Sequence, residues 1–168
     1  MSVNLSARQF GLNNMVDVVK NALESSGLEG RYLELELTEG IMMDRGEEFT
    51  IILNQLKTLN VHLSIDDFGT GYSNLGYLER FPLDTLKIDK LFVKNIGIDG
   101  DNGTIAKMVV QLAHSFGFKV IAEGVETEAQ LDFLRNNDCD CIQGFYFSRP
   151  ILAHDFAILL AHHKPVLA

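Results

Sequence analysis

The chain has 168 residues, of which 46% are hydrophobic and 22% charged, so it fits one globular domain with a substantial core. Its net charge of −9 excludes a general binding surface for a nucleic acid polymer, because a phosphate backbone requires a basic face. No apolar run approaches the ~20 residues of a membrane span, the N-terminus carries no secretory signal, and Cys139 and Cys141 are too close together for a useful disulfide. We therefore expect a cytoplasmic domain, either free or as the cytosolic part of a larger, membrane-anchored protein.

Strand-like and helix-like segments alternate along the whole chain. In chain order they are a strand at 3–5, a helix at 14–25, a strand at 32–37, a helix at 47–59, a strand at 62–65, a helical turn at 74–79, a strand at 85–88, a helical turn at 91–95, a helix at 105–116, a strand at 119–122, a helix at 128–136, a strand at 141–144 and a helix at 154–162. This alternation predicts a parallel sheet, either open and doubly wound or closed into a barrel. The six strands are two fewer than the eight of a (β/α)₈ barrel, which runs to ~250 residues.

Two adjacent acids, Asp66 and Asp67, follow the apolar strand at 62–65 and are followed by a glycine-rich loop. Neighbouring residues on a strand point to opposite faces, so both acids serve one site only if Asp67 already lies in the turn after the strand. The same sequence is also typical of an ordinary turn, in which Asp side chains form hydrogen bonds with the nearby backbone and glycine adopts a positive φ. At this point both interpretations stay open.

The other predicted strands also end in polar or charged residues, and the full set is Asn4, Glu36, Glu39, Asp66, Asp67, Lys87, Asp89, Glu123, Glu126 and Gln143. In parallel α/β folds these strand ends lie on one face, where active sites are built. Carboxylates and a carboxamide are hard oxygen donors that suit Mg²⁺ or Mn²⁺. Such a set could hold two ions ~3.5–4 Å apart that share a bridging carboxylate and bind a phosphate. The chain contains no Ser-His-Asp, Cys-His, P-loop or GxGxxG pattern.

Six motifs in fixed order carry a family resemblance over residues 2 to about 160. They are Ser2-Val-Asn-Leu-Ser6, Glu36-Leu-Thr-Glu39, Asp66-Asp-Phe-Gly-Thr-Gly-Tyr-Ser73, Leu86-Lys-Ile-Asp89, Glu123-Gly-Val-Glu-Thr127 and Gln143-Gly-Phe-Tyr-Phe-Ser-Arg-Pro150. The chain resembles an EAL domain, the cyclic di-GMP phosphodiesterase module of bacterial signalling proteins. The resemblance implies a TIM-like (β/α)₈ barrel, of which residues 1–168 are roughly the C-terminal two-thirds of a single domain. About the first two strands, the Glu-Ala-Leu motif with its metal-ligand glutamate and the arginine after it have no counterpart here.

The resemblance also implies a role for each matching residue. The metal ligands would be Asn4, Glu36, Asp66, Asp67 and Glu123, with Asp66 as the bridge between the ions. Lys87 would orient the attacking water or neutralise phosphate charge, which places it with Asp66, Asp67 and Glu123 as a catalytic residue, and Gln143 would join Lys87 in binding the substrate. Glu39 would hold the loop that couples the metal site to a dimer interface, namely Phe68, Gly69, Thr70, Gly71, Tyr72 and Ser73.

The implied activity is that of a cyclic-guanylate-specific phosphodiesterase, which hydrolyses cyclic di-GMP to linear pGpG with two Mg²⁺ or Mn²⁺ ions. The alternative is a non-catalytic receptor domain that only binds cyclic di-GMP. We expect weak or absent activity for this chain alone, since one ligand glutamate has no counterpart in it. Unpaired strand edges are templates for association, so we expect a homodimer or higher oligomer. The resemblance further implies an upstream sensory or GGDEF domain in the parent protein.

Overall fold

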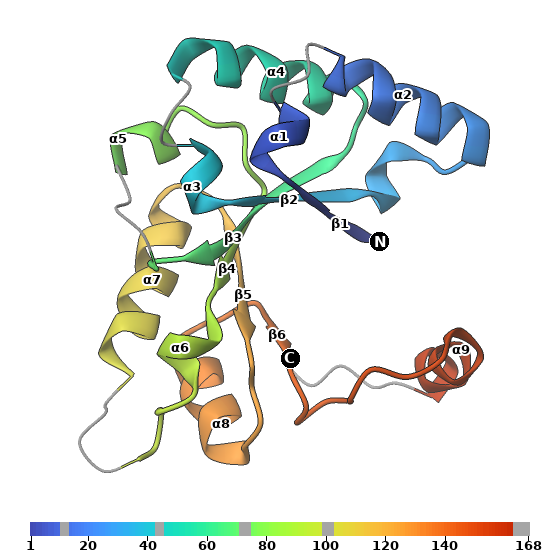
Figure 1. The fold of residues 1–168 in the computed structure, drawn as a ribbon. Coiled ribbons are helices and arrows are strands. Elements are labelled where there is room, and N and C mark those ends of the chain that lie inside the picture. The colour runs from blue at the N-terminus through green and yellow to red at the C-terminus, as the bar shows by residue number, and fades with distance from the viewer. Residues whose placement is uncertain (11–13, 43–45, 71–74, 99–102, 163–168) are drawn as a thin grey trace.

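The computed structural model describes residues 1–10, 14–42, 46–70, 75–98 and 103–162 (Figure 1). Its strands are β1 (Ser2–Leu5), β2 (Glu34–Thr38), β3 (His62–Phe68), β4 (Thr85–Ile88), β5 (Lys119–Glu123) and β6 (Cys141–Gln143). The helices are α1 (Ala7–Phe10), α2 (Met15–Ser26), α3 (Glu39–Met42), α4 (Gly46–Thr58), α5 (Leu75–Leu78), α6 (Lys90–Val93), α7 (Thr104–Ser115), α8 (Glu128–Asn136) and α9 (Ala153–His162), with a 3₁₀ turn, η1, at Gly30–Tyr32.

The six strands form one parallel sheet in which every strand pairs with its neighbours in the sequence, in the order β1-β2-β3-β4-β5-β6. A doubly wound sheet reverses its strand order at one point, so that alternative is excluded. Right-handed crossovers that always step in the same direction place the helices on one face and curve the sheet, as in a (β/α)₈ barrel. The predicted fold class is confirmed: in the described parts of the chain, six parallel strands follow one another in sequence order, consistent with an incomplete barrel of this type (Figure 1).

The two faces of the sheet differ in polarity because the strands alternate along their length. Leu37, Leu63, Ile65 and Leu86 are completely buried among the apolar side chains of the core, which also includes residues from the helices. The opposite face carries polar side chains at positions that pair across the sheet, such as Glu36 on β2 with Ser64 on β3. Burial of the apolar face stabilises the fold, whereas the polar face is left for a site.

Most predicted helices agree with the structure to within one or two residues, and local signals explain the best cases. Helix α8 begins at a capping box, in which Thr127 accepts from the Gln130 N–H while the Gln130 side chain accepts from the Thr127 N–H. Helix α2 ends at Gly27, whose φ of 68° is in the left-handed region. These sequence signals act within a few residues, so they can be seen without knowledge of the tertiary fold.

Two strand predictions need correction. The second strand begins at Glu34 instead of residue 32, because Tyr32 belongs to η1, where the Leu33 N–H donates to the Gly30 oxygen at 2.8 Å. The third strand continues past residue 65 to Phe68, and its register with β4 shifts between Ile65 and Phe68. Such a shift marks an irregularity of the β-bulge type, which hydrophobic alternation does not reveal.

Helix α9 stands apart from the sheet (Figure 1) and has no buried residue. Its side chains Phe156, Ile158 and Leu160 are each about half exposed. Within the described ranges, β1 pairs only with β2 and β6 only with β5, so one edge of each strand is open. In the same ranges, none of the helices combines the length and apolar character needed to cross a bilayer.

Candidate active site

Three carboxylates from three strands surround the ammonium group of Lys87. Lys87 Nζ lies 2.6 Å from Glu123 Oε1, 3.0 Å from Glu36 Oε1 and 3.4 Å from Asp66 Oδ1. The Lys87 side chain is only 5% exposed, and the three acidic side chains are 9–19% exposed. The site is therefore a partly buried cluster with three negative charges and one positive charge, held by β2, β3, β4 and β5.

The register of the sheet explains why these four side chains meet. Glu36 pairs with Ser64, and Asp66 lies two residues after Ser64, on the same face of the sheet. Ser64 pairs with Thr85 on β4, and Lys87, two residues after Thr85, pairs with Ile121 on β5. Lys87 and Glu123, which lies two residues after Ile121, are therefore on the same face of the sheet as Glu36 and Asp66. All four are at or near the C-terminal ends of parallel strands, as the sequence predicts.

The acidic neighbours keep Lys87 charged. Burial alone would lower the pKa of Lys87, but hydrogen bonds from its ammonium group to Glu123 and Glu36, together with the charge of Asp66, raise that pKa above the usual value for lysine. The ammonium group thus supplies a fixed positive charge at the centre of the cluster at neutral pH.

Asp67 has an uncommon backbone conformation next to Asp66. The sequence predicts that both acids serve one site only if Asp67 lies in the turn after the strand, whereas the structure includes Asp67 in β3 with a φ of 55°, in the left-handed region. Burial raises the pKa of Asp67, and a hydrogen bond with the Asp89 carboxyl and the negative charges of Asp66, Asp89 and Glu123 raise it further.

Asp89 is one of the predicted strand-end acids, but the family resemblance assigns it no role of its own. It is 8% exposed, and its Oδ1 accepts from the Leu91 N–H at 2.7 Å, which caps the N-terminus of α6. The Asp89 carboxyl also contributes to the raised pKa of Asp67. The Leu86-Lys-Ile-Asp89 motif contains this residue, but only the tertiary structure shows that it caps α6.

Glu39 and α6 hold the loop after the paired aspartates from two sides. The Gly69 N–H donates to Glu39 Oε2 at 3.0 Å, and Glu39 is 4% exposed. Gly69 has a φ of 92°, and a Cβ built there would lie 2.9 Å from Cε2 of Phe92 on α6. Thr70 Oγ1 donates to the Asp67 oxygen at 2.8 Å, and the Phe68 side chain is 3% exposed. The remaining predicted loop residues, Gly71, Tyr72 and Ser73, are outside the described residues.

The two predicted amide residues extend the site toward the edges of the sheet. Asn4 on β1 pairs in register with Glu36, and Gln143 on β6 pairs with Glu123. Both side chains are exposed. The structure therefore places an amide next to an acid at each end of the row of charged residues.

The donor set of the cluster fits a hard divalent cation. Three carboxylate oxygens already lie within 3.4 Å of one positively charged nitrogen, Lys87 Nζ, and oxygen donors are those that Mg²⁺ and Mn²⁺ prefer. With the acids turned toward Lys87, no three Asp, Glu, His or Cys side chains in the described parts of the chain already form an ion-binding group. The residues that fit an ion best are those that bind the ammonium group here.

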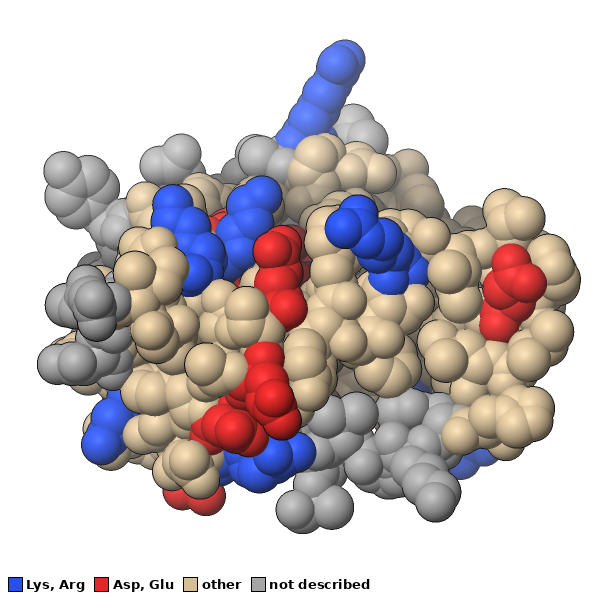
Figure 2. Space-filling model, turned by 90° about the horizontal axis from the view of Figure 1, so that it is seen from below, with Lys and Arg blue, Asp and Glu red and all other residues tan. Residues whose placement is uncertain are grey.

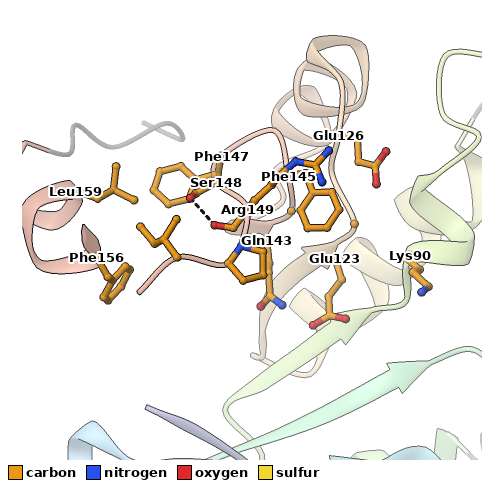
Figure 3. Close-up of a pocket in the computed structure, with 14 residues that line it drawn as sticks. Lys90, Glu123, Glu126, Gln143, Phe145, Phe147, Ser148, Arg149, Phe156 and Leu159 are labelled. Atoms are coloured by element: carbon orange, nitrogen blue, oxygen red, sulfur yellow. Dashed lines mark hydrogen bonds between the residues drawn. The ribbon is translucent and has the colours of Figure 1, made fainter. Parts of the chain in front are cut away.

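A cavity of about 530 Å³ adjoins this cluster (Figure 3). Glu123, Glu126 and Gln143, three of the predicted strand-end residues, line it together with side chains to which the sequence assigned no role, namely Lys90, Phe145, Phe147, Ser148, Arg149, Pro150, Ile151, Phe156 and Leu159. The Arg149 guanidinium carbon lies 4.7 Å from the centre of the Phe145 ring. On the face shown in Figure 2, acidic and basic side chains are interspersed. The cavity thus combines ring surfaces with charged groups next to the acidic cluster.

Comparison with known proteins connects this arrangement to one family. The model of the EAL domain matches residues 1–150. The chain is 46% identical over 151 residues to the cyclic di-GMP phosphodiesterase NbdA of Pseudomonas aeruginosa, a match that covers 90% of this chain and 19% of NbdA. The chain therefore spans about a fifth of the length of that relative.

Two solved structures are similar in sequence and in fold. The MucR phosphodiesterase in complex with c-di-GMP is 45% identical with a TM-score of 0.87, and the match covers 92% of this chain and 63% of that one. Klebsiella pneumoniae BlrP1, in a manganese and cyclic di-GMP complex, is 34% identical with a TM-score of 0.79, over 89% of this chain and 38% of that one. The polar face of the sheet described above thus belongs to a fold that recurs in these two proteins.

Proposed function

This chain belongs to the EAL domain family, and on that basis we propose that it is part of a phosphodiesterase that hydrolyses cyclic di-GMP to linear pGpG. The observation that carries the proposal is the cluster around Lys87, in which carboxylates from three strands converge on one cation beside a cavity. NbdA is named as a cyclic di-GMP phosphodiesterase, and MucR was solved as a complex with c-di-GMP. The reaction would take place at the C-terminal ends of β2 to β5.

The cofactors would be divalent ions, Mg²⁺ or Mn²⁺, at a two-ion site. The structure of BlrP1 with manganese and cyclic di-GMP supports this proposal, as does the oxygen-rich donor set. The ligands would be Asn4, Glu36, Asp66, Asp67 and Glu123, with Asp66 as the bridging ligand. When bound, such ions supply positive charge for the phosphodiester and lower the pKa of water.

The residues of this chain would bind and orient the substrate. Lys87 holds a permanent positive charge within the cluster, so it would neutralise phosphate charge or orient the attacking water. Gln143 pairs with Glu123 at the border of the cavity and would contact the substrate from there. The rings of Phe145, Phe147 and Phe156 would provide stacking surfaces for a purine base.

The assembly that we propose is a homodimer or higher oligomer within a larger, cytoplasmic signalling protein. Glu39 holds Gly69 from one side and Phe92 approaches it from the other, which would allow the loop at 68–73 to transmit contacts between subunits to the acids. MucR is named as a bifunctional diguanylate cyclase and cyclic di-GMP phosphodiesterase, which supports an upstream GGDEF domain or sensory domain in the parent protein.

Incubation of the protein with cyclic di-GMP and Mg²⁺ or Mn²⁺, followed by chromatography for pGpG, tests the proposal. Formation of pGpG that stops on chelation of the metal is the expected result. Binding of cyclic di-GMP without turnover would support the receptor function instead. A parallel experiment with a longer protein that carries an upstream Glu-Ala-Leu segment would measure how much of the activity residues 1–168 provide alone.

A further inference from the structure

We propose that Arg149 is a specificity-determining residue that recognises a guanine base of the substrate through the O6 and N7 acceptors of that base. This inference rests on the proposed function, because it concerns the substrate of the same site. Arg149 lines the cavity beside the acidic cluster and is exposed there (Figure 3). Its position over a ring, the anchored turn that carries it and its unused hydrogen-bond donors support this role.

The Phe145 ring restricts where the Arg149 guanidinium can lie. The guanidinium carbon is 4.7 Å from the ring centre, a distance typical of a cation–π contact. A guanidinium held over a ring still has N–H groups at its edge that can bind other partners. Phe147 and Phe156 line the same cavity and add further ring surface. The cavity therefore combines a positioned set of donors with surfaces that suit a planar base.

A turn anchored to the backbone of Val125 carries the ring and the arginine. The Val125 N–H donates to the Gln143 oxygen at 3.2 Å, and the Tyr146 N–H donates to the Val125 oxygen at 2.9 Å. A Cβ at Gly144 would collide with the Val125 backbone, so the two segments are in direct contact. Val125 itself is completely buried. The turn is thus fixed to the core before a ligand binds, which lowers the entropic cost of recognition.

The donors of the Arg149 guanidinium have no partner among the described residues. Glu126 lines the same cavity, yet no ion pair joins it to Arg149 in those parts of the chain. Lys87, in contrast, is surrounded by three carboxylates. A guanidinium presents two parallel N–H groups that match O6 and N7 of guanine, whereas adenine has a donor in place of O6. In the proposed function the phosphodiester binds at the acidic cluster, so the ring-lined part of the cavity is left for a base.

The experiment compares cyclic di-GMP with its 7-deaza analogue, which keeps the phosphates and O6 but has C–H in place of both N7 atoms. We expect the unchanged chain to bind the analogue about 10-fold more weakly, because one hydrogen bond to a charged donor is lost. Arg149→Met should weaken binding of cyclic di-GMP by at least about 10-fold. The same variant should bind both ligands equally to within about twofold, since N7 no longer has a partner.

Affinities are measured by calorimetric titration with Ca²⁺, and chromatography after each titration confirms that the ligand is intact. Thermal melting tests whether each variant is folded, and Arg149→Ala serves as a second variant if Arg149→Met does not fold. The matched control is Arg31→Met, because the Arg31 guanidinium carbon lies 4.9 Å from the centre of the Tyr32 ring. Arg31 is on η1, before β2 and outside this cavity, so both affinities should stay as in the unchanged chain.

Four results separate this role from its alternatives. An equal loss of affinity for both ligands in Arg149→Met would show that Arg149 binds phosphate and would overturn the proposal. Unchanged affinity for both ligands would show that Arg149 does not contact the substrate. The expected pattern without pGpG formation in Mn²⁺ would support base recognition and refute only the phosphodiesterase activity. An unchanged chain that binds neither ligand would refute the proposed binding of cyclic di-GMP and this role together.

Discussion

Glu123 Oε1 lies 2.6 Å from Lys87 Nζ, closer than the carboxylate oxygens of Glu36 or Asp66. The pair joins the ends of neighbouring strands β5 and β4, and its positive member is 5% exposed. Charge-assisted hydrogen bonds of this length in a partly buried site are strong, because solvent screens them little. Each acid of the cluster therefore depends on Lys87 as long as no other cation is present.

Replacement of Lys87 by Met should destabilise the metal-free protein by about 3 kcal/mol, because three carboxylates would be left without their common partner. Added Mn²⁺ should recover part of this loss, since an ion replaces the missing charge. Thermal unfolding with and without Mn²⁺ measures both effects, and the exposed Lys107→Met on α7 is the matched control. If Lys87→Met were as stable as the control without metal, the cluster would not depend on this ammonium group.

Asp66→Asn should reduce turnover of cyclic di-GMP by about 10³-fold, because the proposed bridging position would lose its charge. The change keeps the size of the side chain, so the free energy of unfolding should change much less than the rate. Initial rates of pGpG formation for this variant and for Asp132→Asn, which removes an exposed negative charge on α8, provide the comparison. A variant that keeps most of the rate would remove Asp66 from the bridging role.

Gly69→Ala should destabilise the protein by about 1–2 kcal/mol, because the residue has a positive φ and the new Cβ would approach the Phe92 ring. Phe92→Leu should relieve the steric part of this loss but not the backbone part. A double-mutant cycle on urea unfolding then yields a favourable coupling of about 0.5–1 kcal/mol. Strict additivity of the two changes would show that α6 does not constrain the loop.

The pH dependence of stability should include a contribution from Asp140. Burial alone would raise the pKa of Asp140, but the contacts with His114 Nε2 at 2.9 Å and the Val120 N–H at 2.8 Å lower it. A lowered pKa in the folded state stabilises the protein above the unfolded value near 3.8, and this stabilisation is lost as the pH falls through the folded value.

Asp140→Asn should therefore lower the free energy of unfolding at about pH 6 and reduce its decrease between about pH 6 and pH 3. Urea unfolding at a series of pH values measures this, and the exposed Asp132→Asn should follow the unchanged chain. An Asp140→Asn curve parallel to that of the unchanged chain over the whole range would contradict the assignment.

The chain should form dimers or higher oligomers, since β1 and β6 each have an edge that no other described strand covers and α9 exposes Phe156 and Leu160. Light scattering over a range of concentrations measures the molar mass. A Leu160→Glu substitution should reduce the mass if the apolar side of α9 takes part, with the exposed Leu152→Glu just before α9 as a comparison. A stable monomer at every concentration would refute the expectation.

The elements that the sequence predicts best are those with local signals. The strand at Thr85–Ile88 and the helix at Glu128–Asn136 begin and end at the predicted residues. The start of the helix is predictable because all residues of its capping box lie within four positions of the sequence. The irregularity at Asp67 could not be predicted in this way, because it depends on how β3 and β4 shift against each other. Alternation of side chains along a strand lets both aspartates face one site only if a turn follows Asp66.

The site shows the same division between local and tertiary information. The position of Glu36, Lys87 and Glu123 at strand ends follows from the alternation of the chain and from parallel pairing. The sequence does not reveal that the Arg149 guanidinium lies over the Phe145 ring, because this contact depends on how the chain packs. The order of the motifs in the sequence identifies the family, whereas the contacts between residues of the site can be seen only in the three-dimensional structure.

The strand order has a consequence for the motions of the molecule. Glu36, Asp66, Lys87 and Glu123 are on β2 to β5, each of which has a hydrogen-bonded strand on both sides. Fraying of a sheet starts at its outer strands, where fewer bonds must open, and amide protons there exchange first. Of the predicted site residues, the edge strands β1 and β6 carry the two with side-chain amides, Asn4 and Gln143. We therefore expect the central strands that carry the charged cluster to exchange their amide protons more slowly than the edge strands, so that brief opening of an edge would release an amide while the acids stay in place.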